Sequence, residues 1–242
     1  MAKQTWKPGN MLYPLPAVLI TVADQQGNPN IFTVAWAGTI CSDPAMVSIS
    51  VRPSRYSHHM IEETGEFVIN LTTRDLAFAT DYCGVKSGRD VDKFKELGLH
   101  ISPASEVSAP LLDESPVNIE CRVTQVLRLG THDMFVAKVV SVHADEKYMD
   151  ENGKFHLNDA GLVAYSHGEY FELGEKLGKF GYSVAKKQAA KTESVTKSAK
   201  PSGAGKKAAS AENRTASKTE AGNRRKSASK TGSADKQKSR RK

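Results

Sequence analysis

The sequence predicts a mainly β fold, a β-barrel with a few short helices, followed by a disordered basic tail. Short runs rich in β-branched and aromatic residues recur along residues 1–185, and turns containing glycine, proline or asparagine separate them. From residue 186 onward the chain is almost entirely Lys, Ala, Ser, Gly, Thr and Arg. Such a segment buries too little apolar surface to offset the entropy lost on ordering. We therefore predict a folded domain over 1–185 and a disordered Lys/Ala/Ser-rich tail over 186–242.

Charge divides the chain at the same place. Residues 1–185 carry 16 basic and 23 acidic side chains, a net charge of −7, whereas residues 186–242 carry 18 and 4, a net charge of +14. The basic pI of about 9.2 therefore reflects the tail, and the acidic body is not a nucleic-acid-binding domain. The tail itself is a candidate for nonspecific nucleic-acid binding through phosphates, although it has no aromatic residue to stack on bases. A solvated extension over the acidic body is the alternative.

The sequence gives no sign of membrane insertion, secretion or a metal site. No apolar run approaches the roughly 20 residues that a spanning helix needs, and residues 1–10 are polar. Three widely spaced cysteines, Cys41, Cys83 and Cys121, lack zinc-finger spacing. We expect them to be structural, in a reduced cytoplasmic protein. No metal ligand set, GxSxG nucleophile motif or P-loop is visible.

The expected strands are short and mostly amphipathic. Met46–Arg52 alternates apolar and polar residues, which is the period of a half-buried strand. A turn is expected at Asp24–Pro29, and Gly130–Asp133 is expected to close a long hairpin. The full set of expected strands is Ala17–Val22, Ile31–Ile40, Met46–Arg52, Phe67–Leu71, Val117–Leu129, Met134–His143 and, last, Leu162–Ser166.

Helices are fewer and short. Ser57 can cap the first of them, and Gly65 and Gly98 stand where the first and third should end. We expect Cys83 and Gly84 to form a turn after the second. The expected helices are Ser57–Thr64, Thr73–Tyr82 and Asp92–Leu97.

The segment Arg52–Ser57, sequence RPSRYS, is a candidate anion site. It places two arginines and two serines between a strand end and a helix N-terminus, where free N–H groups and the helix dipole favour a phosphate. No acidic residue occurs between Pro44 and Glu62 to compete for the arginines. The alternative is that Arg52 and Arg55 pair with surface carboxylates.

Several motifs in order resemble one known family. They are NIFTVAWAG (Asn30–Gly38), SDP (Ser42–Pro44), VSISVRPSRYS (Val47–Ser57), TGEFVINL (Thr64–Leu71) and CGVKSGRDVDKF (Cys83–Phe94). Together they resemble the flavin reductase-like, FMN-binding split-barrel family, and most closely its flavoredoxin-type branch. The resemblance runs from about Met11 to Tyr182, and the tail has no counterpart in it.

The resemblance implies a Greek-key-like split β-barrel with FMN at a homodimer interface. Thr33–Trp36 would border the isoalloxazine ring, Ser50–Arg52 the ring and ribityl chain, and Arg55–Ser57 the phosphate. Lys93 would reach toward the phosphate or the ring edge, and Tyr165 and His167 would extend from the second chain. The implied cofactor-binding set is Asn30, Thr33, Val34, Ala35, Trp36, Ser50, Val51, Arg52, Arg55, Tyr56, Ser57 and Lys93.

Blander interpretations of single residues stay open at this stage. Trp36 lies in a β run and is by itself a candidate core residue, and Lys93 is by default a solvated lysine. Because hydride chemistry belongs to the flavin, no catalytic nucleophile or general base of the protein is expected.

The function that the resemblance implies is electron transfer through bound FMN. The donor would be NADH, NADPH or a protein, and the acceptor free flavin or a partner protein. One alternative is an FMN-binding electron carrier without turnover of NADH or NADPH. Another is a polyanion-binding interaction protein that acts through residues 186–242.

Overall fold

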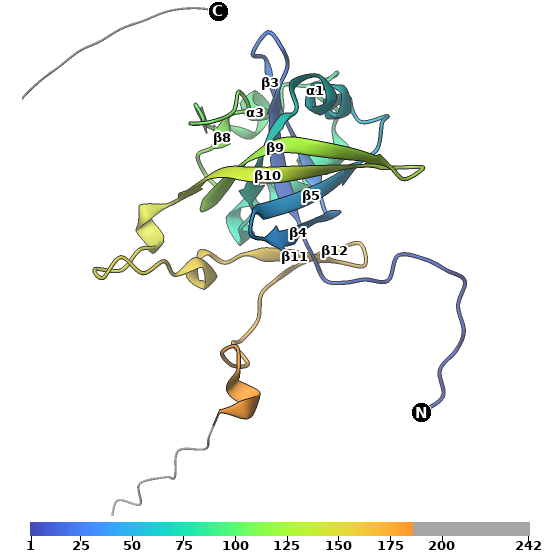
Figure 1. Cartoon of the computed structure of the whole chain (residues 1–242), viewed down its shortest axis with the longest axis vertical. Coiled ribbons are helices and arrows are strands. Elements are labelled where there is room, and N and C mark those ends of the chain that lie inside the picture. Colours follow the sequence, from blue (N-terminus) through green and yellow to red (C-terminus); the bar gives the residue numbers. More distant parts are fainter. Residues whose placement is uncertain (186–242) are drawn as a thin grey trace, which may run out of the picture. The chain divides into compact units, whose positions relative to one another are not determined.

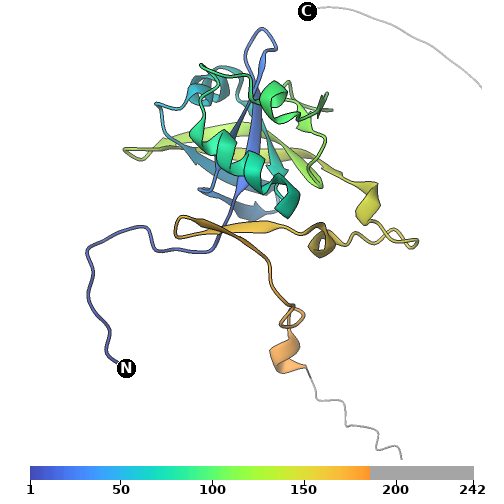
Figure 2. The ribbon, with the colours of Figure 1, turned by 180° about the vertical axis from the view of Figure 1, so that it is seen from behind.

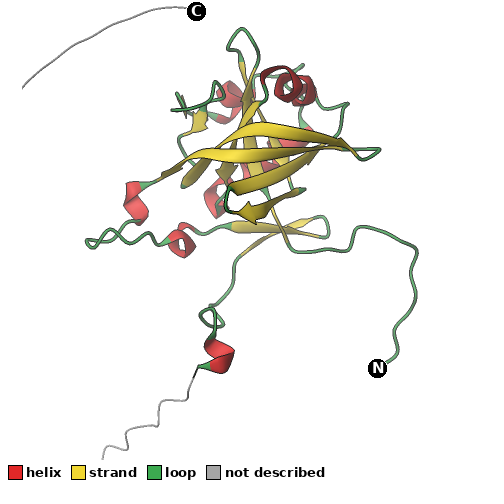
Figure 3. Ribbon diagram, viewed as in Figure 1, coloured by secondary structure: helices red, strands yellow, loops and turns green. Residues whose placement is uncertain are grey.

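The computed structural model describes residues 1–185, so the predicted basic tail lies outside the described residues. Seven antiparallel strands form the main sheet, in the order β3-β2-β6-β9-β10-β5-β4 (Figures 1 and 3). The strands are β2 (Val18–Ala23), β3 (Pro29–Val34), β4 (Ala37–Ser42), β5 (Ala45–Val51), β6 (Glu66–Leu71), β9 (Val117–Arg128) and β10 (Asp133–Ala144). The β9–β10 hairpin is confirmed.

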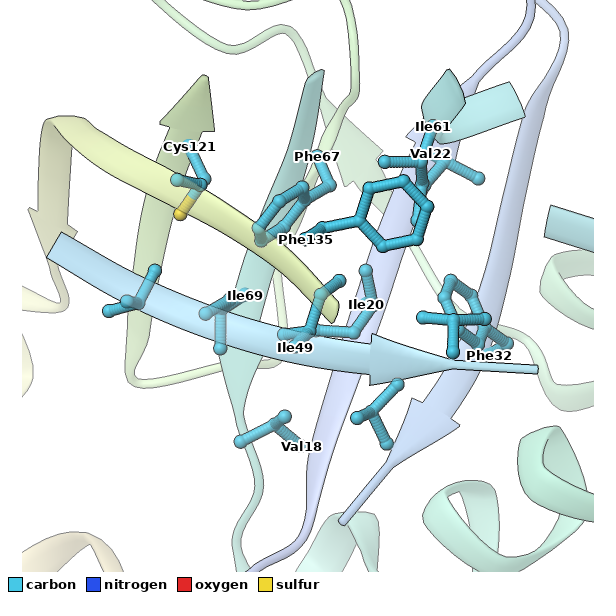
Figure 4. Close-up of a cluster of buried hydrophobic side chains, with 14 of the residues drawn as sticks. Val18, Ile20, Val22, Phe32, Ile49, Ile61, Phe67, Ile69, Cys121 and Phe135 are labelled. Atoms are coloured by element: carbon cyan, nitrogen blue, oxygen red, sulfur yellow. The ribbon is translucent and has the colours of Figure 1, made fainter. Parts of the chain in front are cut away.

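The sheet curls so that its two ends face each other, which confirms the expected barrel. Strands β5 and β10 cross in front of β2, β3 and β6, and apolar side chains fill the space between them (Figure 4). Ile20, Ile49, Phe67 and Phe135 are fully buried there, together with Ile61 of helix α1 (Tyr56–Thr64). Because side chains alternate between the two faces of a strand, one face of each strand points into a shared core.

Strand β2 is buried on both faces because helix α2 (Ala77–Val85) covers its outer side. A second core cluster forms there, in which Leu19 and Ile31 pack with Leu76 and Ala79. Figure 2, which is viewed from the opposite side to Figure 1, shows this helical layer in front of the sheet. A short 3-10 turn, η1 (Arg74–Leu76), leads into α2.

Helix ends follow the glycine signals, whereas one helix start differs. Gly65 and Gly98 adopt left-handed backbone angles after α1 and after α3 (Lys93–Leu97), as expected. The expectation that Ser57 caps α1 is wrong, because the helix begins at Tyr56. Ser57 is buried in the first turn, and its Oγ accepts a 2.7 Å hydrogen bond from Asn30 of β3 instead.

The single strand expected at Ile31–Ile40 is wrong, because the structure divides it into β3 and β4. Strand β3 pairs with β2, while β4 pairs with β5 at the opposite edge of the sheet. The chain must cross between the two edges at Ala35 and Trp36. The Ser50 N–H donates to the Trp36 carbonyl at 2.8 Å and holds this crossing against β5.

The turn expected at Cys83 and Gly84 is also wrong, since both residues belong to α2. A Cβ at Gly84 would lie 3.4 Å from the Thr33 Cβ, in ordinary van der Waals contact, so α2 packs directly against β3 at this point. Cys83 and Cys121 are buried. Burial raises the pKa of their thiols to about 11 and about 12 respectively, which makes them unreactive.

The strand expected at Leu162–Ser166 is β11 (Val163–Ser166), but it is not the last. β12 (Glu169–Glu172) follows β11 in the chain. β11 is the middle strand of a three-stranded sheet and pairs with β12 on one edge and with β1 (Leu15–Pro16) on the other. The remaining elements are β7 (Ile101–Ser102), β8 (Leu111–Leu112), η2 (Glu146–Tyr148), η3 (Leu157–Ala160) and η4 (Tyr182–Val184). Among the described residues, no helix has the length and hydropathy needed to cross a membrane.

Candidate functional site

A wide cleft of about 540 Å³ opens where β3 and β5 end. The crossing between β3 and β4 forms one wall, and the β9–β10 turn forms another. The structure brings together here eight residues that the resemblance implied: Thr33, Val34, Ala35, Trp36, Ser50, Val51, Arg52 and Arg55. We call this space the wide cleft.

A second hollow of about 260 Å³ adjoins the wide cleft and is strongly basic. It shares Thr33, Arg52 and Arg55 with the cleft. The remaining implied residues Asn30, Tyr56, Ser57 and Lys93 line it, with Lys86 and Arg89. Its five cationic side chains face no carboxylate within the lining, and we call it the basic hollow.

The arginines of this hollow do not form the carboxylate pairs that the alternative interpretation required. Within residues 1–185, arginine–carboxylate pairs involve Arg74, Arg122 and Arg128. Arg52 and Arg55 have no carboxylate oxygen within 4.0 Å there. Their charge remains available to an anion in the hollow.

Lys93 is not the solvated lysine of the default interpretation, because it is only 2% exposed. Its Nζ donates to the Lys86 carbonyl over a long 3.4 Å. Burial lowers the pKa of Lys93, and the nearby Arg55 charge lowers it further. The bond to Lys86 is the one hydrogen bond of the Lys93 ammonium among the described residues, and a nearby anion would offset the cost of burying its charge.

The start of α1 also lies at the basic hollow. Arg55, Tyr56 and Ser57 line it, so the positive end of the helix dipole adds to the side-chain charge. Arg89 lies over the Tyr56 ring, 5.4 Å from its centroid. At Gly88 a Cβ would come within 2.4 Å of the Asn30 Oδ1, so the 86–89 loop approaches this closely only with glycine.

Sequence reasoning missed the contribution of Lys86, Ser87, Gly88 and Arg89. Two cations, a serine and a glycine in succession are a usual composition for an anion-binding loop, and that signal could have found it. It also missed His132 and Tyr170 of the wide cleft, which only the tertiary structure places there.

Trp36 lines the wide cleft and is 37% exposed, so it is not the core residue of the alternative interpretation. Its ring is parallel to that of His132, with planes 2° apart and centroids 6.2 Å apart. Burial and the charge of Arg52 lower the pKa of His132, which favours the neutral imidazole. The cleft therefore has a flat aromatic wall at its mouth.

Tyr165 lines the wide cleft of its own chain, beside Tyr170 at a centroid distance of 5.6 Å. His167 is not among the lining residues and contacts the Tyr13 ring instead. A contribution of either residue to a second chain stays a prediction.

In this curled antiparallel barrel, a cleft lined by Trp36 lies next to a basic hollow with no carboxylate in its lining, an arrangement that could hold a planar ring carrying a phosphate. Residues 11–174 match the family model described as the flavin reductase like domain. The chain belongs to this family.

Known relatives agree with the fold. Flavoredoxin of Desulfovibrio vulgaris (Miyazaki F) is 31% identical and superposes with a TM-score of 0.70, covering 76% of this chain and 100% of its own. An uncharacterized protein of Archaeoglobus fulgidus is 31% identical over 66% of this chain and 88% of its length. The NADH:riboflavin 5'-phosphate oxidoreductase of Streptomyces pristinaespiralis is 23% identical over 54% of this chain and 72% of its length.

Proposed function

We propose that the protein is an FMN-dependent oxidoreductase that passes electrons from NADH or NADPH to free flavin or a partner acceptor. The carrying observation is the basic hollow, where buried Lys93 lies with two arginines that form no carboxylate pair within residues 1–185 and an anion would balance their charge. The hollow opens into the wide cleft, where Trp36 offers an apolar surface for a ring system. FMN has this combination of a planar ring and a terminal phosphate.

In this proposal the protein binds and orients, and the cofactor supplies the redox chemistry. Arg52, Arg55 and Lys93 hold the phosphate with the start of α1, while Thr33–Trp36 and Ser50–Val51 border the ring. When held by these residues, FMN would supply the hydride and electron-transfer chemistry. The positive potential of Arg52, which lines both spaces, stabilises negative charge at the ring.

The absorbance spectrum of the purified protein tests the cofactor. We expect a yellow protein, or a colourless one that becomes yellow on adding FMN, with flavin absorbance released on denaturation. Protein that cannot be loaded with FMN would refute the proposal.

An electron carrier without its own turnover is the second candidate, and the 31% identity to a flavoredoxin favours it. Both candidates share one site and differ in rate. Anaerobic mixing of the FMN-loaded protein with NADH and then NADPH separates them, because rapid bleaching of the flavin identifies a reductase.

We also propose a cytoplasmic homodimer. Edge strand β4 is exposed, with Ile40 49% accessible. It borders an apolar groove of about 550 Å³ formed with Met11, Leu12 and Trp36. A second copy of the chain would cover this surface and its unpaired strand edge. Sedimentation equilibrium tests this, and a monomer at micromolar concentration would contradict it.

A further inference from the structure

Four side chains, two of them adjacent in sequence to site residues, form a closed ring of imidazole, carboxylate and guanidinium groups. His58 of α1 is 4% exposed, its Nε2 lies 2.8 Å from the Asp133 Oδ2, and its Nδ1 lies 3.2 Å from the Glu62 Oε2. Arg128 of β9 hydrogen-bonds both carboxylates. We call these four residues the charge ring.

The charge ring is complete without a metal ion. The ligand atoms of His58, Glu62 and Asp133 lie within 4.8 Å of one another, a spacing that a cation could use. However, Arg128 and His58 already satisfy both carboxylates. Burial alone would raise the pKa of Asp133, but the hydrogen bonds from Arg128 and His58 outweigh it and lower the pKa. The geometry is that of an ionic clamp.

The charge ring links α1, whose start borders the basic hollow, to the β9–β10 hairpin, whose turn borders the wide cleft. His58 directly follows Ser57 of the basic hollow. Asp133 directly follows His132 of the wide cleft, and it pairs in register with Val51 at the end of β5. None of the four residues lines either space, so their influence on a ligand must act through these neighbours.

We propose that His58 and Asp133 are positioning residues that fix the wide cleft and the basic hollow relative to each other. The proposal rests on the proposed function, in which FMN occupies both spaces at once. A ligand that engages two subsites gains affinity only when their spacing matches its own. A ligand that engages one subsite is indifferent to that spacing.

Three ligands on the full-length protein test this role. FMN engages both subsites, riboflavin only the cleft, and inorganic phosphate only the hollow. In His58→Gln and Asp133→Asn we expect FMN affinity to fall at least about tenfold. Riboflavin affinity, and the rise in Tm that phosphate causes, should stay within about twofold of wild type. Titrations use about 150 mM salt throughout, so that the tail contributes equally in every variant.

His156→Gln is the matched control. It breaks a similar histidine–carboxylate pair, 2.9 Å from Asp150, that lines neither space, and its FMN affinity should not change. If Asp133→Asn does not fold by circular dichroism, Glu62→Gln opens the same ring at a side chain that is 35% exposed.

Unchanged FMN affinity in the folded ring variants would overturn the proposal. So would an equal fall for FMN and riboflavin, or a lost phosphate response, because either result means local damage to one subsite. Wild-type protein that binds neither flavin would refute the proposed function itself, and the positioning role with it.

Discussion

Arg52 and Arg55 lie in one turn between β5 and α1, and Lys93 is the first residue of α3, yet all three line one hollow. The arginines are exposed and Lys93 is buried, so their energetic costs differ. An exposed arginine stays hydrated in the empty site, whereas a buried ammonium has lost most of its hydration. In the proposed complex one phosphate would therefore contact two kinds of cation, and a different substitution tests each kind.

Replacing both arginines should distinguish the contribution of the phosphate to FMN affinity from that of the ring. In the double variant Arg52→Ala/Arg55→Ala we expect FMN affinity to fall at least about 100-fold, because each charge-assisted hydrogen bond contributes about 1.5–3 kcal/mol. Riboflavin has no phosphate, so its affinity should fall much less than that of FMN. Fluorescence titration measures both ligands. The control Arg74→Ala/Arg122→Ala removes the same charge outside the hollow, and equal losses for FMN and riboflavin would exclude a phosphate role.

Lys93→Met should shift stability and affinity in opposite directions. Methionine fills a similar volume without a buried charge, so the flavin-free protein should gain about 1 kcal/mol in its free energy of unfolding. FMN affinity should fall, because one phosphate partner is lost. Urea unfolding and FMN titration measure the two effects. A variant that is less stable and binds FMN normally would show that Lys93 is structural.

At the scale of elements, buried Glu120 of β9 anchors the loop that precedes β8. Its carboxylate is fully buried. It accepts hydrogen bonds from the backbone N–H groups of Ser105, Glu106 and Val107, and it contacts His143 of β10. Burial acts to raise the pKa of Glu120, but these donors outweigh it and lower the pKa to about 2.

Acid should therefore weaken this anchor. A carboxyl whose folded pKa is depressed stabilises the fold above its unfolded value, near 4.5, and that contribution is lost as the pH falls toward about 2. Glu120→Gln should lower the free energy of unfolding at neutral pH by about 2–4 kcal/mol, because an amide places donors against donors. Glu120→Gln should also make the free energy of unfolding fall less steeply as the pH is lowered.

Urea unfolding between about pH 7 and pH 3 measures both effects. Glu63→Gln, on the exposed side of α1, is the control and should behave as wild type. If the variant and wild type lose stability in parallel on acidification, Glu120 is not the titrating anchor.

At the scale of the whole molecule, an acidic body of net charge −7 joins a segment of net charge +14. The cations of the basic hollow belong to the acidic body, so the basic pI of the whole chain does not reflect them. Residues 186–242 lie outside the described residues, so their role as a nonspecific nucleic-acid arm stays a prediction from composition.

Truncation at residue 185 tests that arm. The full chain should retard DNA or RNA in a gel, and the 1–185 protein should not. If about six phosphates are neutralised, affinity should fall about 10³-fold between 50 and 200 mM salt. FMN binding should survive the truncation, since every residue of the proposed site lies before 185. Equal retardation by the two proteins, or none at low salt, would exclude the arm.

Much of the site could be predicted because most of its residues lie in two short motifs, Asn30–Gly38 and Val47–Ser57. The glycine ends of α1 and α3 and the β9–β10 hairpin were equally readable, since each depends on local backbone geometry. Trp36, Arg52 and Arg55 were identified through their motifs, although the motifs alone did not say whether Trp36 was core or cleft.

Other features depended on long-range pairing and could not be read locally. The division of Ile31–Ile40 into β3 and β4 reflects pairing with opposite sheet edges, and both halves have the same β-type composition. Lys93 has the polarity of any surface lysine, and its burial follows from the packing of α3 beside β3.

By itself, then, the sequence determined the fold class, the split in charge and the two arginines of an anion site, because composition, period and local turns are encoded within short windows. Only the tertiary structure decided that those arginines form no carboxylate pair within residues 1–185, that Lys93 is a buried cation, and that His58 and Asp133 form a buried pair. The physical reason is that burial and charge pairing are set by residues far apart in the chain, which a curled sheet brings together.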